Sequence, residues 1–336
     1  MSEAVTADRI FETGLGFMAS KVLLSAVEIG LFTELAKGPA DLGTIARKFD
    51  LHQRSAADFL DALVTLKFLQ RDRGVYRNSA EADRFLDKAK PDYMGGIFEM
   101  ANARLYAFWG SLTDALRTGL KQNETKDDPE IFQKMYADPE RLKGFLKAMT
   151  GLSKHSGRAI AQKFDWRPYK SFVDVGAAEG AVPVELALAH KHLTGGGFDL
   201  PQVQPVFEKY VREHGLAERI TFQVGDMFKD KWPKTDVIIM GHILHDWGME
   251  RKRLLLSRAY DALPKDGAVI VYDCMIDDER SQHLGGLLMS LNMLIETDDG
   301  FDYTFGQCRQ WMRETGFRET RVEHLAGADW MVVGIK

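Results

Sequence analysis

The chain has 336 residues, of which 45% are hydrophobic and 28% are charged. These values are typical of a soluble globular protein, and the length leaves room for two domains that each bury a core. Lys and Arg number 44 and Asp and Glu number 49, so the net charge of −5 excludes a general electrostatic attraction to nucleic acid or to an anionic membrane.

The N-terminal sequence MSEAVTADRIFETG has no basic segment followed by an apolar one, and we find no run close to the ~20 apolar residues of a membrane span. A cytoplasmic protein without a membrane partner is therefore expected. The two cysteines, Cys274 and Cys308, lack the C-x-x-C spacing and the histidine pair of a zinc site. We expect neither a disulfide nor a bound metal, and both cysteines should be packed thiols.

The first part of the chain predicts a small domain made mainly of helices. Its first predicted helix, Phe17 to Leu35, is apolar nearly all round, which is more than one core-facing stripe requires. After a break at Gly38 and Pro39, two short helices and the polar hairpin QRDRGVYRNS follow. This order predicts a winged helix, and the apolar excess of the first helix favours self-association as a homodimer.

Winged helices often read DNA, so a non-enzymatic regulator is one alternative. The helix that would enter the groove, Arg54 to Leu69, carries two acidic residues, Asp58 and Asp61, beside its basic ones. An element that contacts phosphates is expected to be clearly basic. We therefore expect no nucleic-acid partner.

Two helical patterns follow, from Pro91 to about Leu120 and from Pro139 to Phe164. We place the domain boundary inside the first of them. The chain is then expected to consist of a winged-helix dimerisation domain at residues 1–105 and a second domain at residues 106–336.

The second domain is organised around the stretch Ser171 to Gly180, SFVDVGAAEG, which predicts a strand and a tight turn before a helix over Ala181 to His190. Small residues let the backbone approach a ligand, and the helix N-terminus offers free N–H groups. Gly176 and Gly180 fit this use. The acid two residues before Gly176 suits an amino group better than a pyrophosphate, and a tight connection without any ligand is the plain alternative.

Strand patterns then alternate with helical ones. The first expected strand is the start of Ser171–Gly180, around Phe172 to Val175. The others are Gly195–Asp199, Ile220–Val224, Asp236–Met240, Ala268–Asp273, 317–325 and 330–336. The alternation predicts an α/β fold, a Rossmann-like seven-stranded and mostly parallel sheet with helices on both faces. Because no helix separates the last two strands, at least one of them should run antiparallel.

Polar residues follow the carboxyl ends of these strands, where sheets of this type bind ligands. In chain order they are Asp199, Asp226 with Met227, His245 with Asp246, and Asp273. Asp199 stands about twenty residues after the turn, where an acid can hold a ribose diol. Four loops are therefore expected to converge on one crevice.

The chain resembles the S-adenosylmethionine-dependent small-molecule O-methyltransferases of the caffeic acid and hydroxyindole type. The matching motifs are VDVGxxxG at Val173–Gly180, FDLPxV at Phe198–Val203, GDMF at Gly225–Phe228, HDW at His245–Trp247 and ALPxxGxVIV at Ala262–Val271. The resemblance spans nearly the whole chain, including the winged helix that forms the dimer in this family. It implies methyl transfer from S-adenosylmethionine to a hydroxyl of a small aromatic molecule.

The resemblance also implies which residues hold the cofactor. The expected set is Ser153, Gly176, Asp199, Leu200, Asp226, Met227 and Phe228. In the family the first acid holds the ribose, the Asp-Met pair addresses the adenine and the serine approaches the cofactor carboxylate. These roles are physically reasonable, because carboxylates accept from paired hydroxyls, a thioether packs on a ring and a hydroxyl donates to a carboxylate.

The general base of the family is the histidine of HDW, here His245. Methyl transfer to oxygen needs alignment and removal of the hydroxyl proton, and an imidazole suits the second need. His242, one turn away, is the competing candidate. The two flanking family carboxylates match Asp273 and Asp302, both one methylene shorter than Glu, so the hydrogen bond to His245 should be direct for one and water-mediated for the other.

The acceptor pocket is expected, by match to family positions, from two helices. Its residues are Phe145, Met149, Met289, Asn292 and Met293. Methionines give an adaptable apolar wall and Asn292 can orient a polar group of the acceptor, whereas ordinary core packing is the alternative for the methionines.

The chain departs from the family at Ala177 and Ala178, where Gly is usual, and at Gly241, where plant members often carry Lys. Two added methyl groups in a turn that touches the cofactor either weaken binding or shift its backbone. A thiol or carbon acceptor, or non-methylating chemistry on the same cofactor-binding fold, is the alternative reaction.

Overall fold

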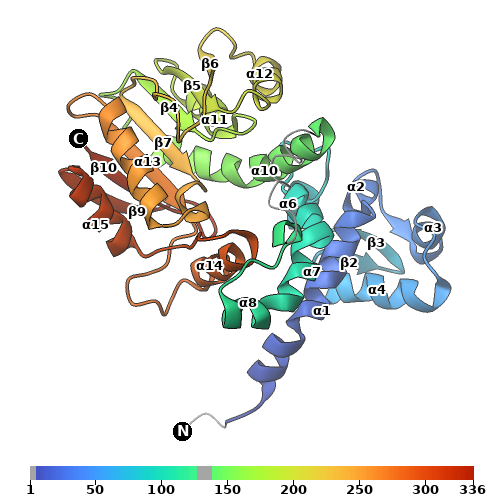
Figure 1. Ribbon diagram of the computed structural model, residues 1–336. Helices are drawn as coiled ribbons and strands as arrows, with labels where there is room; N and C mark the ends of the chain where they lie inside the picture. The colour runs from blue at the N-terminus through green and yellow to red at the C-terminus, as the bar shows by residue number, and fades with distance from the viewer. Residues whose placement is uncertain (1–4, 127–137) are drawn as a thin grey trace. The chain divides into compact units, whose positions relative to one another are not determined.

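The computed structural model describes residues 5–126 and 138–336. The chain divides into two compact units, Met1–Ala107 and Phe108–Lys336, and each is described by itself (Figure 1).

The N-terminal unit is mainly helical. Its helices are α1 (Asp8–Glu28), α2 (Leu31–Leu35), α3 (Leu42–Lys48), α4 (Gln53–Thr65), α5 (Ala80–Phe85), α6 (Gly95–Met100) and the π-helical turn η1 (Ala101–Leu105). Its strands are β1 (Ala40–Asp41), β2 (Leu69–Asp72) and β3 (Val75–Asn78), paired in the order β1-β3-β2. Two helices followed by a hairpin are thus present where the sequence predicted them.

The first helix differs from the prediction at both ends. α1 begins at Asp8 and ends at Glu28, and the separate α2 covers Leu31–Leu35. Gly30 between them has φ +75, a left-handed conformation that interrupts a helix and that glycine adopts without steric cost. The prediction of a single helix over Phe17–Leu35 is therefore wrong.

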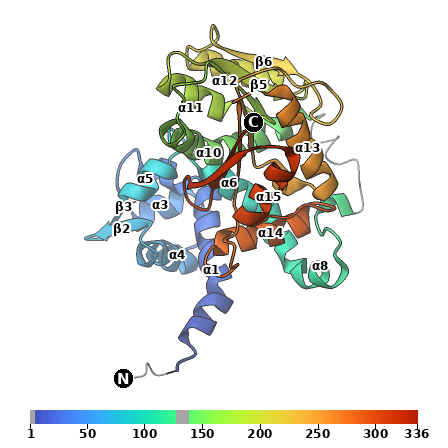
Figure 2. The ribbon, with the colours of Figure 1, turned by 90° about the vertical axis from the view of Figure 1, so that its left-hand side faces the viewer.

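The N-terminal half of α1 extends beyond the other elements of its unit in both ribbon views (Figures 1 and 2). Its exposed apolar side chains are Ile10, Phe11, Leu15, Phe17 and Met18. By length and composition α1 is long and apolar enough to cross a membrane, which corrects the expectation that the chain has no such run. A helix that packs in a protein interface meets the same criteria.

The C-terminal unit holds a seven-stranded sheet. Its strands are β4 (Ser171–Val175), β5 (Thr194–Asp199), β6 (Ile220–Val224), β7 (Val237–Gly241), β8 (Ala268–Asp273), β9 (Glu319–His324) and β10 (Trp330–Ile335). Its helices are α8 (Leu112–Thr118), α10 (Pro139–Lys163), α11 (Ala181–Ala189), α12 (Gln204–Glu213), α13 (Met249–Ala262), α14 (Leu284–Glu296) and α15 (Phe305–Thr315), with short turns η2 (Trp109–Ser111), η3 (Glu124–Lys126) and η4 (Leu244–Asp246). The short α7 (Tyr106–Phe108) precedes η2.

The strand order is β6-β5-β4-β7-β8-β10-β9. The first five strands are parallel, and β10 runs antiparallel to both β8 and β9, so the prediction of a mostly parallel sheet with an antiparallel member is confirmed. In this register Trp330, at the start of β10, pairs with Asp273, at the end of β8. The residue before Trp330 is thereby carried to the carboxyl edge of the sheet.

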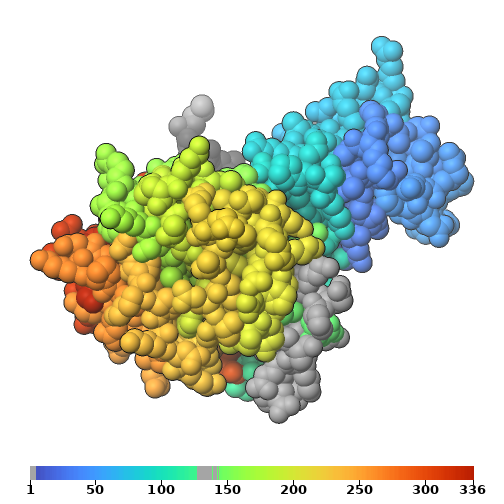
Figure 3. Space-filling view, turned by 90° about the horizontal axis from the view of Figure 1, so that it is seen from above, coloured from blue at the N-terminus to red at the C-terminus, as the bar shows by residue number. Residues whose placement is uncertain are grey.

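Successive residues of the central strands point to opposite faces, which is the period of a strand buried on both sides. Ile239 packs with α10, α11 and α12, whereas Ile238 packs with α13 and α15. α10 and α11 lie side by side on the first face (Figure 2). The segment from α12 to β7, drawn in yellow, occupies much of the face of this unit that is turned to the viewer in Figure 3.

Candidate active site

The turn between β4 and α11 brings the backbone to the carboxyl edge of the sheet. Gly176 has φ +74 and Gly180 has φ +90, conformations that residues with a Cβ rarely adopt. A Cβ at Gly176 would collide with Ile243, and one at Gly180 would lie 2.6 Å from the ring of Phe207. The N-terminus of α11 has no side-chain cap, which leaves its first N–H groups for a ligand.

The two alanines of this turn differ in backbone conformation. Ala177 is buried in the core in an ordinary conformation, whereas Ala178 has φ +49, which is strained for a residue with a Cβ. The N–H of Ala178 donates to the carboxylate of Asp199 at 3.1 Å. The turn is therefore held in place by the acid at the end of β5.

Asp199 is 8% exposed and accepts a second hydrogen bond from the N–H of Leu200 at 2.7 Å. Burial raises the pKa of Asp199 to about 6, although both backbone hydrogen bonds oppose the shift. Burial, with Asp199 adding to it, also raises the pKa of Asp174 on β4 well above its usual range. Two neighbouring buried carboxyl groups favour a ligand that presents hydroxyl or amino donors.

The loop after β6 supplies the next predicted residues. Asp226 accepts from the N–H of Phe228 at 2.8 Å and pairs with Lys229 at 3.1 Å; although partial burial opposes it, these contacts lower the pKa of Asp226. The Met227 side chain reaches the turn, 3.7 Å from where a Cβ on Gly176 would stand. The loop therefore meets the turn at the same edge of the sheet.

Phe228 packs edge to face on Trp247, with ring centroids 4.8 Å apart. The guanidinium of Arg251 lies 4.6 Å from the centroid of the Trp247 ring. The indole N–H of Trp247 is buried and has no hydrogen-bond partner among the described residues. An orphaned buried donor at this edge is a group that a ligand can satisfy.

Tyr272, near the end of β8, explains the departure at Gly241. A Cβ on Gly241 would collide with the Tyr272 ring, so no side chain fits there while that ring is in place. The Tyr272 side chain hydrogen-bonds with Ser153, which is half-buried on α10. Ser153 is thus tied to the strand that ends in Asp273.

His245 lies on η4 with 5% of its surface exposed. Its Nδ1 donates to Asp302 Oδ1 at 3.2 Å and stands 3.9 Å from Asp273 Oδ1, too far for a hydrogen bond. Its Nε2 lies 3.6 Å from Asp246 Oδ1, again beyond hydrogen-bond length. The ring is therefore oriented through Nδ1, and Nε2 has no hydrogen bond to Asp246.

The charges around His245 favour its protonated form. Burial alone disfavours an imidazolium, but Asp273, Asp246 and Asp302 outweigh it and raise the pKa of His245 to about 10. Asp273 is completely buried and accepts from the hydroxyl of Tyr303 through Oδ2. Its Oδ1 has no hydrogen-bond partner among the described residues.

His242, the competing histidine, is held by a separate acid. It has φ +52, and its Nε2 donates to Asp329 Oδ2 at 3.2 Å. Ser156 at 2.5 Å and Cys274 at 3.3 Å donate to the same carboxylate. Despite its burial, Asp329 has a pKa lowered to about 2 by His242 and these donors.

The residues expected to line the acceptor pocket fall into two groups. Met289, Asn292 and Met293 lie on α14, where the Asn292 side chain accepts from the indole N–H of Trp109 at 3.0 Å. Phe145, on α10, instead packs with a cluster that includes Val203 and Ala178, beside the turn. Met149 is half-buried one turn further along α10. The structure thus places Phe145 beside the turn, and Met289, Asn292 and Met293 together on α14.

Three side chains at this site were not predicted from the sequence: Tyr303, Asp329 and Lys252. Tyr303 follows Asp302 directly and could have been found from that neighbour. Asp329 and Lys252 belong to no motif, and only the fold brings them to the carboxyl edge.

Within residues 5–126 and 138–336, two groups of side chains have donor atoms within 4.8 Å of one another, as a metal site requires: His242, Cys274 and Asp329, and His242, His245 and Asp273. Hydrogen bonds among the first group already use its donors. Both cysteines are free and buried. The expectation of no metal stays a prediction.

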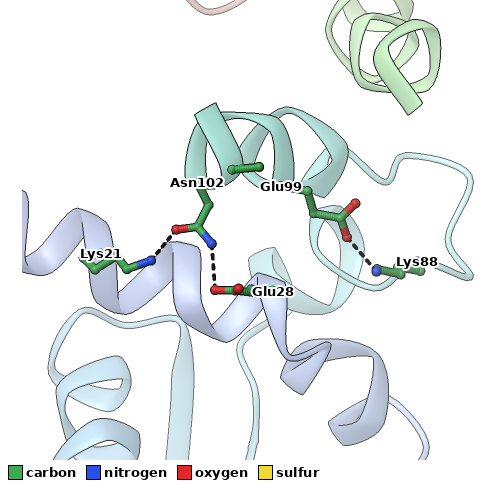
Figure 4. Close-up of a pocket in the computed structure, with 6 residues that line it drawn as sticks. Lys21, Glu28, Lys88, Glu99 and Asn102 are labelled. Carbon is green, nitrogen blue, oxygen red and sulfur yellow. Dashed lines mark hydrogen bonds and ion pairs between the residues drawn. The ribbon is translucent and has the colours of Figure 1, made fainter. Parts of the chain in front are cut away.

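A pocket of about 410 Å³ lies in the N-terminal unit instead, lined by Lys21, Glu28, Lys88, Glu99, Asn102 and Ala103 (Figure 4). Asn102 bridges Lys21 and Glu28, and Lys88 pairs with Glu99 at 2.6 Å. Because these charges neutralise one another, the pocket offers no activated group.

Comparisons with known proteins agree with this geometry. A family model of the O-methyltransferase domain matches residues 109–318, and a model of the O-methyltransferase dimerisation domain matches residues 11–88. The tetracenomycin polyketide synthesis 8-O-methyl transferase TcmO of Streptomyces glaucescens is 42% identical over 328 residues, which cover 97% of this chain and 96% of TcmO. The N,N-dimethyltransferase OxyT of Streptomyces rimosus is 35% identical over 340 residues, covering 100% of this chain and 98% of OxyT.

A crystal structure of human N-acetylserotonin methyltransferase in complex with S-adenosylmethionine is 28% identical, with a TM-score of 0.90, and the match covers 100% of this chain and 99% of that one. The resemblance drawn from the motifs and the expected fold are thereby confirmed. The chain belongs to the O-methyltransferase family and is an S-adenosylmethionine-dependent methyltransferase with an N-terminal dimerisation domain.

Proposed function

We propose that this methyltransferase acts on a hydroxyl of a small aromatic molecule, with His245 as the general base. The observation that carries the proposal is the orientation of His245. Its Nδ1 is held by Asp302 at 3.2 Å, whereas its Nε2 has no hydrogen bond to the nearest carboxylate. A ring held at one nitrogen can accept a proton at the other.

The residues at the carboxyl edge fit the cofactor. The N-terminus of α11 after the glycine turn has no side-chain cap, Asp199 offers carboxylate oxygens for a diol, and the buried indole N–H of Trp247 has no acceptor among the described residues. Asp226, Met227, Phe228, Leu200 and Ser153 complete the proposed cofactor set. S-adenosylmethionine, when bound, supplies an electrophilic methyl group.

The chain's own part in the reaction is to hold the acceptor hydroxyl and remove its proton. Only neutral His245 can accept that proton, and its pKa near 10 keeps most of the imidazole protonated at neutral pH. The rate should therefore rise with pH between 7 and 10. Asp302 keeps the proton on Nδ1, so that Nε2 is the basic nitrogen.

The acceptor is proposed to lie against α14, where Met289 and Met293 give apolar surface and Asn292 a polar group. Phe145 and Met149 would close it from α10. TcmO is named for O-methylation in the synthesis of a polyketide, which supports a hydroxyl as the acceptor.

A second candidate is an amine acceptor, because OxyT is named as an N,N-dimethyltransferase. An amine that reacts as the free base needs no general base at the moment of attack, so its methylation depends less on His245. A thiol acceptor would share this independence.

Purified protein titrated calorimetrically with S-adenosylmethionine and with S-adenosylhomocysteine tests the cofactor, and absence of binding to both would reject it. Naphthols, naphthylamines and naphthalenethiols, with methyl addition read by mass spectrometry, test the acceptor class. We expect turnover of a naphthol, with His245→Gln lowering kcat about 100-fold or more. His242→Gln is the matched control, and equal losses in both variants would contradict the role of His245.

The N-terminal unit is proposed to be a winged helix that forms a homodimer. The support is the match to a dimerisation domain and the exposed apolar face of α1, which includes Phe11, Leu15 and Met18. Light scattering on a variant in which Phe11, Leu15 and Met18 are all replaced by Ser should show a monomer. A stable dimer of that variant would contradict the role of α1 in self-association. A cytoplasmic location stays a prediction.

A further inference from the structure

Lys252 is a charged residue at a place where an apolar one would be expected. It lies on α13 and is completely buried, with 0% of its surface exposed. Lysine is almost never fully buried unless it is paired, because removing an ammonium from water is costly. Groups around Lys252 are therefore expected to compensate its buried charge.

The ammonium of Lys252 joins two segments of chain. It donates to the carbonyl oxygen of Trp247 and, at 3.0 Å, to that of Phe301. It also stands 3.6 Å from the centroid of the Phe301 ring, in cation–π geometry. Trp247 lies two residues after His245, and Phe301 directly precedes Asp302, so one ammonium ties together the two segments that carry the histidine and its carboxylate.

The same two segments are packed without space between them. A Cβ added at Gly300 would lie 2.6 Å from the carbonyl oxygen of His245, and one added at Gly248 would collide with Asp299. The backbone carrying Asp302 therefore sits directly on the backbone carrying His245, and the Lys252 contacts are made beside this seam.

The charge of Lys252 is also matched to the site. Four carboxylates favour its charged form, namely Asp273 at the end of β8, Asp302 and Asp299 on the loop before α15, and Asp246 on η4. Burial nevertheless dominates and lowers the pKa of Lys252 to about 8. The ammonium thus offsets part of the negative charge that His245 faces.

We propose that Lys252 is a positioning residue for the pair His245 and Asp302, tying the two backbone segments so that the carboxylate meets Nδ1. The proposal rests on the proposed role of His245 as the base. Lys252 itself does not touch the reacting atoms in this arrangement. Its removal should loosen one hydrogen bond, that between His245 and Asp302.

The first test needs no acceptor. In protein labelled with ¹⁵N-histidine, the Nδ1 proton of His245 is identified by its disappearance in His245→Gln. In Lys252→Met we expect this proton to be lost from the spectrum or to exchange about tenfold faster or more, since its acceptor is no longer held. The Nε2 proton of His242 is the internal control, because it is held by Asp329, which directly precedes β10 and lies outside the two segments that Lys252 ties. Arg253→Met, which removes an exposed charge from the same helix, should change neither proton.

The second test is kinetic, with a naphthol as the probe acceptor. Lys252→Met should lower kcat about tenfold while calorimetry shows unchanged affinity for S-adenosylmethionine. In an Asp302→Asn background the same substitution should cost little more, because the contact it maintains is already gone. Losses that multiply would show that Lys252 acts elsewhere.

Equal behaviour of the His245 proton in wild type and Lys252→Met would overturn the proposal, and so would loss of both histidine protons, which indicates a general loosening. Lys252→Gln keeps an N–H donor and removes the charge, and it serves if the Met variant does not fold. If neither folds, Lys252 is a core residue and the positioning role is wrong. Full activity of His245→Gln would instead refute His245 as the general base, and the proton measurements would still test whether Lys252 positions the pair.

Discussion

Asp199 offers a prediction in which affinity and stability move in opposite directions. Its pKa near 6 is well above the ordinary value of about 4, so ionising it inside the fold costs about 3 kcal/mol more than in water. Asp199→Asn removes that cost and keeps an oxygen to accept from the N–H of Leu200 or Ala178. After the loss of one charged hydrogen bond, we expect a net stabilisation of about 1 kcal/mol at pH 7.5.

A change of this size should raise the Tm of the cofactor-free protein by about 2 to 4 °C. The pH dependence has a definite sign. Because the folded pKa of Asp199 is raised, its contribution to stability is present below pH 4 and is lost as the pH rises through 6. The advantage of the Asn variant should therefore appear above pH 6 and vanish near pH 4.

The affinity for S-adenosylmethionine should fall in the same variant. Hydrogen bonds to a charged group contribute about 1.5 to 3 kcal/mol, which corresponds to a roughly 10- to 100-fold weaker Kd. In wild type the affinity should also weaken as the pH falls below 6 and the carboxyl is protonated, whereas the variant should be insensitive there. Calorimetry and thermal unfolding measure both effects, with the exposed Asp261→Asn as the control. A Kd within threefold of wild type, or a lower Tm at pH 7.5, would refute the reasoning.

Three further predictions follow from the site. Gly176→Ala forces a side chain into a left-handed conformation against Ile243, so calorimetry should detect no cofactor binding, whereas Gly327→Ala, in open space, should bind normally. Asp302→Asn removes a carboxylate 3.2 Å from His245 and should lower the pKa of that histidine from about 10 to about 8 or 9. The acid limb of the kcat/KM profile should then move to lower pH by the same amount. An unmoved limb would exclude His245 as the titrating group. Asp329 has a pKa of about 2, so its stabilisation is present above pH 4 and lost as the pH falls to 2; Asp329→Asn should destabilise by about 2 to 3 kcal/mol in urea at pH 7 and by little at pH 2.

The sheet could be predicted because its strands are short apolar runs that end in polar residues. Ile220–Val224 and Ala268–Asp273 appear in the structure with the predicted bounds. The predicted bounds of the first helix were wrong because a single residue ends that helix. Gly30 breaks the first helix, and its left-handed φ depends on packing that no apolar periodicity records.

The candidate site residues that belong to motifs were predicted from the sequence, whereas those outside any motif were missed. Asp329 comes to His242 only because β10 inserts between β8 and β9, which carries the start of β10 to the end of β8. Lys252 stands in the charged run ERKR of α13, a pattern that normally marks a solvated face. The grouping of Phe145 with α14 came from family positions, while the structure packs it beside Val203.

The carboxylates beside His245 are Asp where the resembling family has Glu, and a change in the backbone compensates for the shorter side chain at one of them. With Asp in place of Glu, the side chain reaches one methylene less far, so a direct bond to His245 requires the backbone itself to come closer. Asp302 achieves this, at 3.2 Å, on a loop that Gly300 allows to rest on the His245 carbonyl. Asp273, fixed on β8 and held by Tyr303, stays at 3.9 Å. The direct bond therefore forms at the carboxylate whose backbone lies on a loop, and Lys252 is the side chain that ties this loop to the histidine segment.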